Sequence, residues 1–167
     1  GRSPPSPCGV RPFLPLPPPL IRLFSATAGS RMNTLFLKAP QLTAEIMRAQ
    51  GLAEPTGQAK ITPGYNLPCQ YIIHTVGPIV GETLKPEDER LLASCYLSCL
   101  KLADEYHLAN IAFCCISTGE FHFPSEFAAE IALETVQKYR AQSKSSIEVI
   151  FNVFKEEDER LYKQLLG

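Results

Sequence analysis

Three apolar, β-branched runs alternate with three segments of helical periodicity in this 167-residue chain, and this alternation restricts its fold more than any other feature. The runs and the helical segments follow one another at 70–76, 86–107, 110–116, 125–140, 147–154 and 156–165. Continuous apolar runs are typical of strands that are buried on both faces of a parallel sheet. The order therefore predicts an α/β fold with a mostly parallel sheet and right-handed crossover connections.

The segment 117–123 joins the second apolar run to the helical segment that follows it. Its sequence, Ser117-Thr118-Gly119-Glu120-Phe121-His122-Phe123, is typical of a tight turn between a strand and a helix. A glycine lets the backbone come close to a ligand, and consecutive N–H groups at such a turn bind phosphate oxygens. Phe121 and Phe123 are candidates to stack on a sugar or a base. The alternative is an ordinary turn that needs a glycine and closes over the core.

The position of the segment 117–123 helps to decide between a ligand loop and an ordinary turn. Ligands of parallel α/β sheets bind beyond the carboxyl ends of the strands. Three segments are expected at that edge, namely 76–78, 117–123 and 152–155. Because 117–123 is the middle one, its position favours a ligand loop, although the ordinary turn stays open.

Composition is that of a single globular domain with a real core, since 45% of the residues are hydrophobic. The net charge of -1 and the pI of about 6.4 predict no nucleic-acid partner and no membrane partner. No apolar run approaches the roughly 18 residues that span a bilayer. The six cysteines lie mostly within apolar patterns, which favours reduced, buried thiols. By default we expect a cytoplasmic protein.

Residues 1–40 differ from the rest of the chain. Eight of the fifteen prolines fall before residue 20, and no Asp or Glu precedes Glu45. We expect an extended or disordered, locally polyproline-like segment, with the folded domain over 41–167 and a helix at 43–50. The Arg-containing, acid-free stretch also resembles an organelle transit peptide. The chain begins at Gly1 and not at a methionine, so the sequence need not be complete.

From about Ala44 onward, the chain closely resembles the macrodomain family. The motifs that carry the resemblance, in order and at family spacing, are Pro55-Thr56-Gly57-Gln58-Ala59, Tyr71-Ile72-Ile73-His74-Thr75-Val76-Gly77-Pro78, Leu92-Ala93-Ser94-Cys95-Tyr96, Ile111-Ala112-Phe113, Ile116-Ser117-Thr118-Gly119, Phe123-Pro124 and Ala128-Ala129. The versions at 115–124 and 151–155 look most like those of the zinc-dependent protein ADP-ribosyl hydrolases.

The resemblance implies a three-layer α/β/α fold whose N-terminal strands are absent from this chain. It also implies that the chain binds ADP-ribose or an ADP-ribosylated protein, and that it removes ADP-ribose from modified proteins. The loop that wraps the diphosphate and the distal ribose, through backbone N–H groups, is matched by Ser117, Thr118, Gly119, Glu120 and Phe121. Asn152 and Phe154 match the place where the adenine packs.

The zinc-dependent branch of the family further implies a zinc ion, held by Cys, His and Cys side chains in a loop that precedes these motifs. The corresponding region of this chain is its proline-rich end. An alignment on Ala28-Gly29 places Pro12, Pro17 and Pro19 at the three ligand positions, and proline has no side-chain donor for a metal. We therefore assign no metal ligand and no catalytic residue. The acid that reads the adenine in the family has no counterpart before Glu45.

The remaining cysteines are not expected to form a metal site. Cys95 and Cys99 lie four residues apart on an apolar helix face, as core thiols do. Cys114 and Cys115 are adjacent in a predicted strand, so their side chains point to opposite faces and chelate one ion poorly.

Other titratable residues also have ordinary explanations. His74 is expected to be a satisfied core histidine, whereas His122 either touches a ligand or caps a turn. Glu120 is a general base only if burial raises its pKa, and at a turn it is expected to be solvated. The charged run 155–160 is expected to be an exposed helix start.

The sequence leaves three alternative functions open. The first is a protein ADP-ribosyl hydrolase, and the second is a module that binds ADP-ribose without turnover. The third is a truncated macrodomain that binds no ligand well. In the third case a sheet without its first strands would expose an apolar edge, which favours association.

Overall fold

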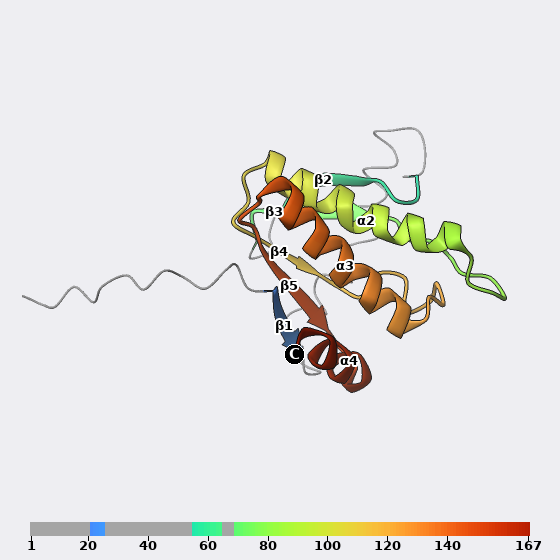
Figure 1. Ribbon diagram of the computed structural model, residues 1–167. Helices are drawn as coiled ribbons and strands as arrows, with labels where there is room; N and C mark the ends of the chain where they lie inside the picture. Colours follow the sequence, from blue (N-terminus) through green and yellow to red (C-terminus); the bar gives the residue numbers. More distant parts are fainter. Residues whose placement is uncertain (1–20, 26–54, 65–68) are drawn as a thin grey trace, which may run out of the picture.

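The structure is a computed structural model that describes residues 21–25, 55–64 and 69–167 (Figure 1). Its elements, in chain order, are β1 (Ile21–Ser25), β2 (Ala59–Pro63), β3 (Tyr71–Thr75), α2 (Pro86–Glu105), β4 (Asn110–Phe113), α3 (Ser125–Ser143), β5 (Glu148–Val153) and α4 (Glu156–Leu166). The predicted alternation of strands and helices is confirmed. The helix expected at 43–50 lies outside the described residues.

β5 is the centre of a parallel sheet with the strand order β1-β5-β4. Phe113 of β4 lies opposite Phe151 of β5, and Ser25 of β1 lies opposite Val153. β1 falls inside the segment that we expected to be extended or disordered, and its five residues form an extended strand of the sheet. It also gives the sheet one strand from the N-terminal part of the chain, where we expected none. The rest of residues 1–40 lies outside the described part.

The strand at 71–75 is not part of the parallel sheet, which corrects the prediction. β3 pairs antiparallel with β2, with Ala59 opposite Thr75 and Ile61 opposite Ile73. The turn is closed at its base, where the N–H of Gly64 donates to the carbonyl of Gln70 at 2.8 Å. None of the five residues of β3 is fully buried. An apolar run does not show which strand will pair with it, and here the neighbouring strand in sequence does so.

β4 and β5 are fully buried on one face only, not on both as predicted. In β4, Ile111 and Phe113 are buried while Asn110 and Ala112 are exposed, and in β5 buried residues alternate with half-buried ones. The buried face packs against the helices: the ring of Tyr96 on α2 lies 5.0 Å from that of Phe113, measured between centroids. Of the predicted three layers, the described residues therefore form the sheet and the helical layer on this face.

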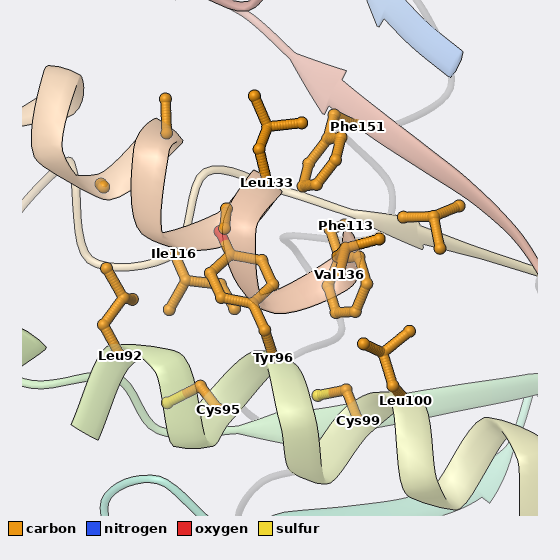
Figure 2. Close-up of a cluster of buried hydrophobic side chains, with 14 of the residues drawn as sticks. Leu92, Cys95, Tyr96, Cys99, Leu100, Phe113, Ile116, Leu133, Val136 and Phe151 are labelled. Atoms are coloured by element: carbon orange, nitrogen blue, oxygen red, sulfur yellow. The ribbon is translucent and has the colours of Figure 1, made fainter. Parts of the chain in front are cut away.

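The core lies between this sheet face and the three helices. Figure 2 shows Leu92, Cys95, Tyr96, Cys99 and Leu100 on one side of α2, directed toward the strands and α3. Ala132, Leu133 and Val136 of α3 close the core from the other side. The ring of Tyr162 on α4 lies 5.0 Å from that of Phe151, so α4 covers the end of the same core. Within the described chain, no helix has both the length and the apolarity that crossing a membrane requires.

Candidate functional site

The predicted ligand loop lies at the carboxyl end of β4, as expected. It begins after Phe113 and ends at Pro124, directly before α3. Because β4 and β5 are parallel and paired through Phe113 and Phe151, residues 152–154 lie at the same edge. The segment after β3 also reaches this edge, since the N–H of Val80 donates to the carbonyl of Phe121 at 2.9 Å. The convergence of the three predicted segments is confirmed.

The loop has a compact backbone that is held by its own carbonyl groups. The carbonyl of Ser117 accepts from the N–H of Phe123 at 2.9 Å, and that of Gly119 accepts from the N–H of His122 at 3.0 Å. The hydroxyl of Thr118 donates to the carbonyl of Cys115 at 3.2 Å. Ser117 and His122 both adopt left-handed conformations, with φ of 64° and 56°. Left-handed conformations are rare for residues other than glycine, so the surrounding contacts must stabilise the loop.

Gly77 makes the left-handed conformation of Ser117 compatible with the rest of the structure. A Cβ atom on Gly77 would lie 2.0 Å from the Oγ of Ser117 and 2.7 Å from Cγ2 of Ile116. Both distances are far inside van der Waals contact. The Ser117 hydroxyl oxygen is itself buried and makes no hydrogen bond to any described residue. The close contact between the end of β3 and the start of the loop thus requires a residue without a side chain.

The loop leaves several backbone donors unused. Within the described residues, the N–H groups of Gly119, Glu120 and Phe121 make no hydrogen bond, whereas the carbonyls of Ser117, Gly119 and Phe121 each accept one. A Cβ atom on Gly119 would meet nothing within 4 Å, so this part of the backbone borders open space. Successive free N–H groups at the end of a parallel strand form a concavity that suits an anion such as a phosphate.

The aromatic residues around the loop differ in their burial. Phe121 is half-buried, whereas the side chain of Phe154, directly after β5, is 70% exposed. Phe123 is only 2% exposed and belongs to the core, so it is not available to a ligand and this part of the prediction is wrong. Asn152 is half-buried in β5, two residues before Phe154. Phe121 and Phe154 are therefore the two predicted aromatic residues whose rings can cover a ligand.

Three titratable residues named in the sequence analysis differ in their surroundings. Glu120 is exposed, as expected, and His122 is also exposed. His74 was expected in the core but is only half-buried. The Nε2 atom of His74 lies 2.9 Å from the hydroxyl oxygen of Thr62, across the β2–β3 hairpin. His74 is thus a hydrogen-bonded residue of the hairpin and lies outside the candidate site.

The described cysteines show no arrangement that would hold a metal. Burial raises the pKa of the Cys95 thiol, and it raises that of Cys99 to about 12. These two thiols are core residues, as predicted. In the part of the chain that the structure describes, no group of three or more His, Cys, Asp or Glu side chains could hold a metal ion. The described residues therefore do not fit the zinc ion that the resemblance implies, and we derive no reaction step through it.

Sequence reasoning placed residues 76–78 at the edge of the candidate site but missed Ile79 and Val80, which follow them. Ile79 is 67% exposed and directly precedes Val80, which is hydrogen-bonded to the loop. The signal is Gly77-Pro78, which we placed at this edge of the sheet without predicting its close contact with the loop. A glycine that is buried at a strand end often marks a close approach of two backbones.

Comparisons with known proteins agree with this arrangement. A family model described as Macro domain matches residues 36–132. The chain is 55% identical, over 124 residues, to a protein-ADP-ribose hydrolase of Treponema medium; the match covers 74% of this chain and 48% of that protein. A protein-ADP-ribose hydrolase of Staphylococcus aureus strain MSSA476 is 56% identical over 122 residues, covering 72% of this chain and 46% of that protein. The chain thus spans about half the length of these curated relatives.

Solved structures give the same result for the fold. The Oceanobacillus iheyensis macrodomain with ADP superimposes with a TM-score of 0.68 at 33% identity, covering 87% of this chain and 83% of that one.

Proposed function

Because this chain belongs to the macrodomain family, we propose that it binds ADP-ribose at the loop 117–121, beside the carboxyl end of β5. The diphosphate lies against the N–H groups of Gly119, Glu120 and Phe121. The ring of Phe121 covers the distal ribose, and the adenine packs against Asn152 and Phe154.

This proposal rests on the N–H groups of Gly119, Glu120 and Phe121, which make no hydrogen bond to any described residue. Glu120 is exposed and its carboxylate would repel a diphosphate, so the attraction must come from the backbone. The exposed ring of Phe154 offers a flat apolar surface, on which a base gains stacking energy. The structure of the Oceanobacillus iheyensis macrodomain, which is described as being with ADP, contains a nucleotide of the same diphosphate chemistry.

We further propose that the chain acts on ADP-ribosylated proteins, as a part of a protein ADP-ribosyl hydrolase. The relatives from Treponema medium and Staphylococcus aureus carry the name protein-ADP-ribose hydrolase, which supports this reaction class. The described residues alone would not hold the zinc ion of such enzymes, because no three His, Cys, Asp or Glu side chains among them are grouped to bind a metal ion. The second candidate is binding of ADP-ribose without turnover, which needs only the loop and the end of β5.

Calorimetric titration of the 167-residue chain with ADP-ribose, with and without zinc, tests the binding proposal. We expect saturable binding of one ADP-ribose per chain. ADP and free ribose serve as partial ligands, and ADP should retain most of the affinity because it keeps the diphosphate. A folded, monodisperse sample that gives no heat with ADP-ribose would refute the proposal.

Release of ADP-ribose from a modified protein separates the two candidate functions. The hydrolase proposal predicts that the chain frees ADP-ribose from an automodified substrate, and that zinc increases the rate. A chain that binds ADP-ribose and releases none, with zinc present, is a binding module.

A further inference from the structure

Two serine hydroxyls of α2 donate to a single backbone carbonyl outside the helix. The Oγ atoms of Ser94 and Ser98 each lie 2.9 Å from the carbonyl oxygen of Gly57, which precedes β2. Serine is a mediocre helix former, and inside a helix its hydroxyl commonly bonds back to the preceding turn. Here the two hydroxyls, one turn apart, occupy both lone pairs of a carbonyl that is 37 and 41 residues away in the chain. The two bonds therefore fix Gly57 against α2.

Gly57 in turn holds the end of β3. Its N–H donates to the carbonyl of Val76 at 3.0 Å, and the thiol of Cys95, beside Ser94 in α2, donates to the same carbonyl at 3.4 Å. Gly57 is buried with a φ of 85°, and a Cβ atom on it would lie 3.1 Å from both Cβ and Oγ of Ser94. Any other residue would thus be strained in its backbone and crowded against the helix. α2 therefore holds Val76 directly and also through Gly57.

The residues that follow in the chain hold the ligand loop. Gly77 lies so close to Ser117 that a Cβ atom on it would be 2.0 Å from the Ser117 Oγ atom. The N–H of Val80 donates to the carbonyl of Phe121 at 2.9 Å. The segment 76–80, which we call the strap, is therefore fixed to α2 at its first residue and contacts the first and the last residue of the ligand loop.

We propose that Ser94 and Ser98 are positioning residues, which set the place of the ligand loop through Gly57 and the strap. This inference rests on the proposed ADP-ribose site, because its consequence is the placement of the N–H groups that we assign to the diphosphate. The adenine position should not depend on the strap, since Asn152 lies in β5 and Phe154 directly after it, and β5 belongs to the other sheet. Loss of the two hydroxyls should therefore act on the diphosphate end of the ligand and spare the adenine end.

The two hydroxyls can replace one another, which determines the design of the variants. The carbonyl keeps one donor when either serine is replaced, so Ser94→Ala or Ser98→Ala alone should weaken ADP-ribose binding less than about twofold. The double variant leaves the buried carbonyl with neither donor and should weaken binding about tenfold, more than the product of the single effects. Ser94→Ala/Ser98→Thr keeps one hydroxyl and should bind as Ser94→Ala does. Ser146→Ala, at an exposed serine outside the strap, is the control and should bind as wild type does.

Ligand fragments separate positioning from a general loss of structure. Calorimetry measures the affinity for ADP-ribose and ADP, NMR titration measures that for adenosine, and thermal unfolding shows that each variant is folded at the titration temperature. We expect the double variant to lose about tenfold for ADP-ribose and ADP and to stay within about twofold of wild type for adenosine. Equal losses for all three ligands would overturn the positioning role, because partial unfolding reduces every affinity alike.

A measurement without ligand tests the coupling itself. Amide chemical shifts of the loop 117–121 report its backbone geometry, and those of β1, at the opposite edge of the sheet from β4, serve as the reference. The loop amides should shift in the double variant while the β1 amides keep their wild-type positions. Loop amides that keep their wild-type shifts would overturn the inference.

The outcomes distinguish this inference from the function on which it rests. Wild-type protein that binds ADP-ribose, together with a double variant of equal affinity, overturns the positioning role alone. Wild-type protein that binds no ADP-ribose overturns the proposed function and the positioning role together, and loop shifts in the double variant then show only a structural contact. If the double variant does not fold, Ser94→Ala/Ser98→Cys, whose thiol is a weaker donor, should lose about threefold for ADP-ribose and nothing for adenosine. Unchanged ADP-ribose affinity in that variant overturns the positioning role.

Discussion

At the scale of single residues, the candidate site depends on two glycines with opposite surroundings. Gly77 is buried and faces Ser117 and Ile116 at distances that admit no side chain. Gly119 is exposed and faces open space. The first glycine is needed for the fold of the loop, and the second keeps the loop accessible. Substitution by alanine at the two positions should therefore affect different properties.

Gly77→Ala is expected to lower both stability and affinity. The added methyl group must displace Ser117 or the end of β3, which costs about 1–3 kcal/mol by analogy with overpacked cores. The displaced loop should bind ADP-ribose at least about tenfold more weakly. Urea denaturation and calorimetry measure the two effects. Gly81→Ala, where a Cβ atom would meet nothing within 4 Å, is the matched control; an equal loss there would contradict the explanation.

Gly119→Ala is expected to weaken binding without loss of stability. Neither a positive φ nor a close neighbour requires glycine at this position, so the free energy of unfolding should change by less than about 0.5 kcal/mol. The new methyl group would project beside the N–H groups that we assign to the diphosphate, and we expect about a tenfold loss of ADP-ribose affinity. Unchanged affinity would place the diphosphate elsewhere.

At the scale of elements, β5 serves the core and the candidate site with neighbouring residues. Phe151 is 1% exposed, and its ring lies 6.1 Å from that of Phe113 and 5.0 Å from that of Tyr162, between centroids. Phe154, one residue beyond the strand, is 70% exposed. One short strand thus supplies a core aromatic residue and, just past its end, a ring available to a ligand.

Alanine substitution should separate these two roles. Phe151→Ala is expected to destabilise the protein by about 3–5 kcal/mol, the usual cost of removing a buried aromatic ring. Phe154→Ala should leave the free energy of unfolding almost unchanged but reduce ADP-ribose affinity about tenfold, through loss of base stacking. Chemical denaturation followed by titration gives both values. A large loss of stability in Phe154→Ala would show that its ring packs within the protein.

The same scale shows what the sequence can and cannot predict. Helical periodicity located α2, α3 and α4, because their apolar faces pack on one continuous core. The Ser-Thr-Gly turn before α3 identified the loop and its place at the sheet edge. Strand partners were not predictable in the same way: β3 pairs with β2, and β1 comes from a proline-rich region. Pairing depends on contacts distant in sequence, which a local pattern does not contain.

Side-chain surroundings in the site were predictable only in part. Phe121 and Phe123 are two residues apart and look equivalent in the sequence, yet Phe123 lies in the core. For Phe123 the turn explains the difference, because Ser117 and His122 adopt left-handed conformations and the N–H of Phe123 donates to the carbonyl of Ser117. We expected the charged run 155–160 to be an exposed helix start, and this is wrong for Asp158, which is 5% exposed.

At the scale of the whole molecule, the core holds the thiols of two cysteines in neutral form. Burial raises the pKa of the Cys95 thiol, and it raises that of Cys99 to about 12. In the unfolded chain these thiols ionise near pH 9. Above that pH the folded state binds more protons than the unfolded state, so stability must fall as the pH rises toward 12.

We therefore expect a marked loss of stability in alkaline solution under reducing conditions. The free energy of unfolding should fall by up to about 1.4 kcal/mol per pH unit for each thiol that ionises only on unfolding. Urea denaturation at about pH 8 and about pH 10 measures the slope, and Cys99→Ala should reduce it. Equal slopes in the two proteins would show that Cys99 ionises without unfolding.

The division into two sheets also concerns the whole molecule. Among the described residues, no strand of the β2–β3 hairpin is hydrogen-bonded to a strand of the β1-β5-β4 sheet. α2 and the contact between Gly77 and Ser117 hold the hairpin in place. Backbone segments joined in this way can open as separate cooperative units with different free energies. Amide hydrogens of β2 and β3 should thus exchange with deuterium faster than those of β4 and β5, and uniform protection would contradict this. Because each opening of the hairpin also releases Ser117, a ligand held by the loop should slow exchange in strands that it never touches.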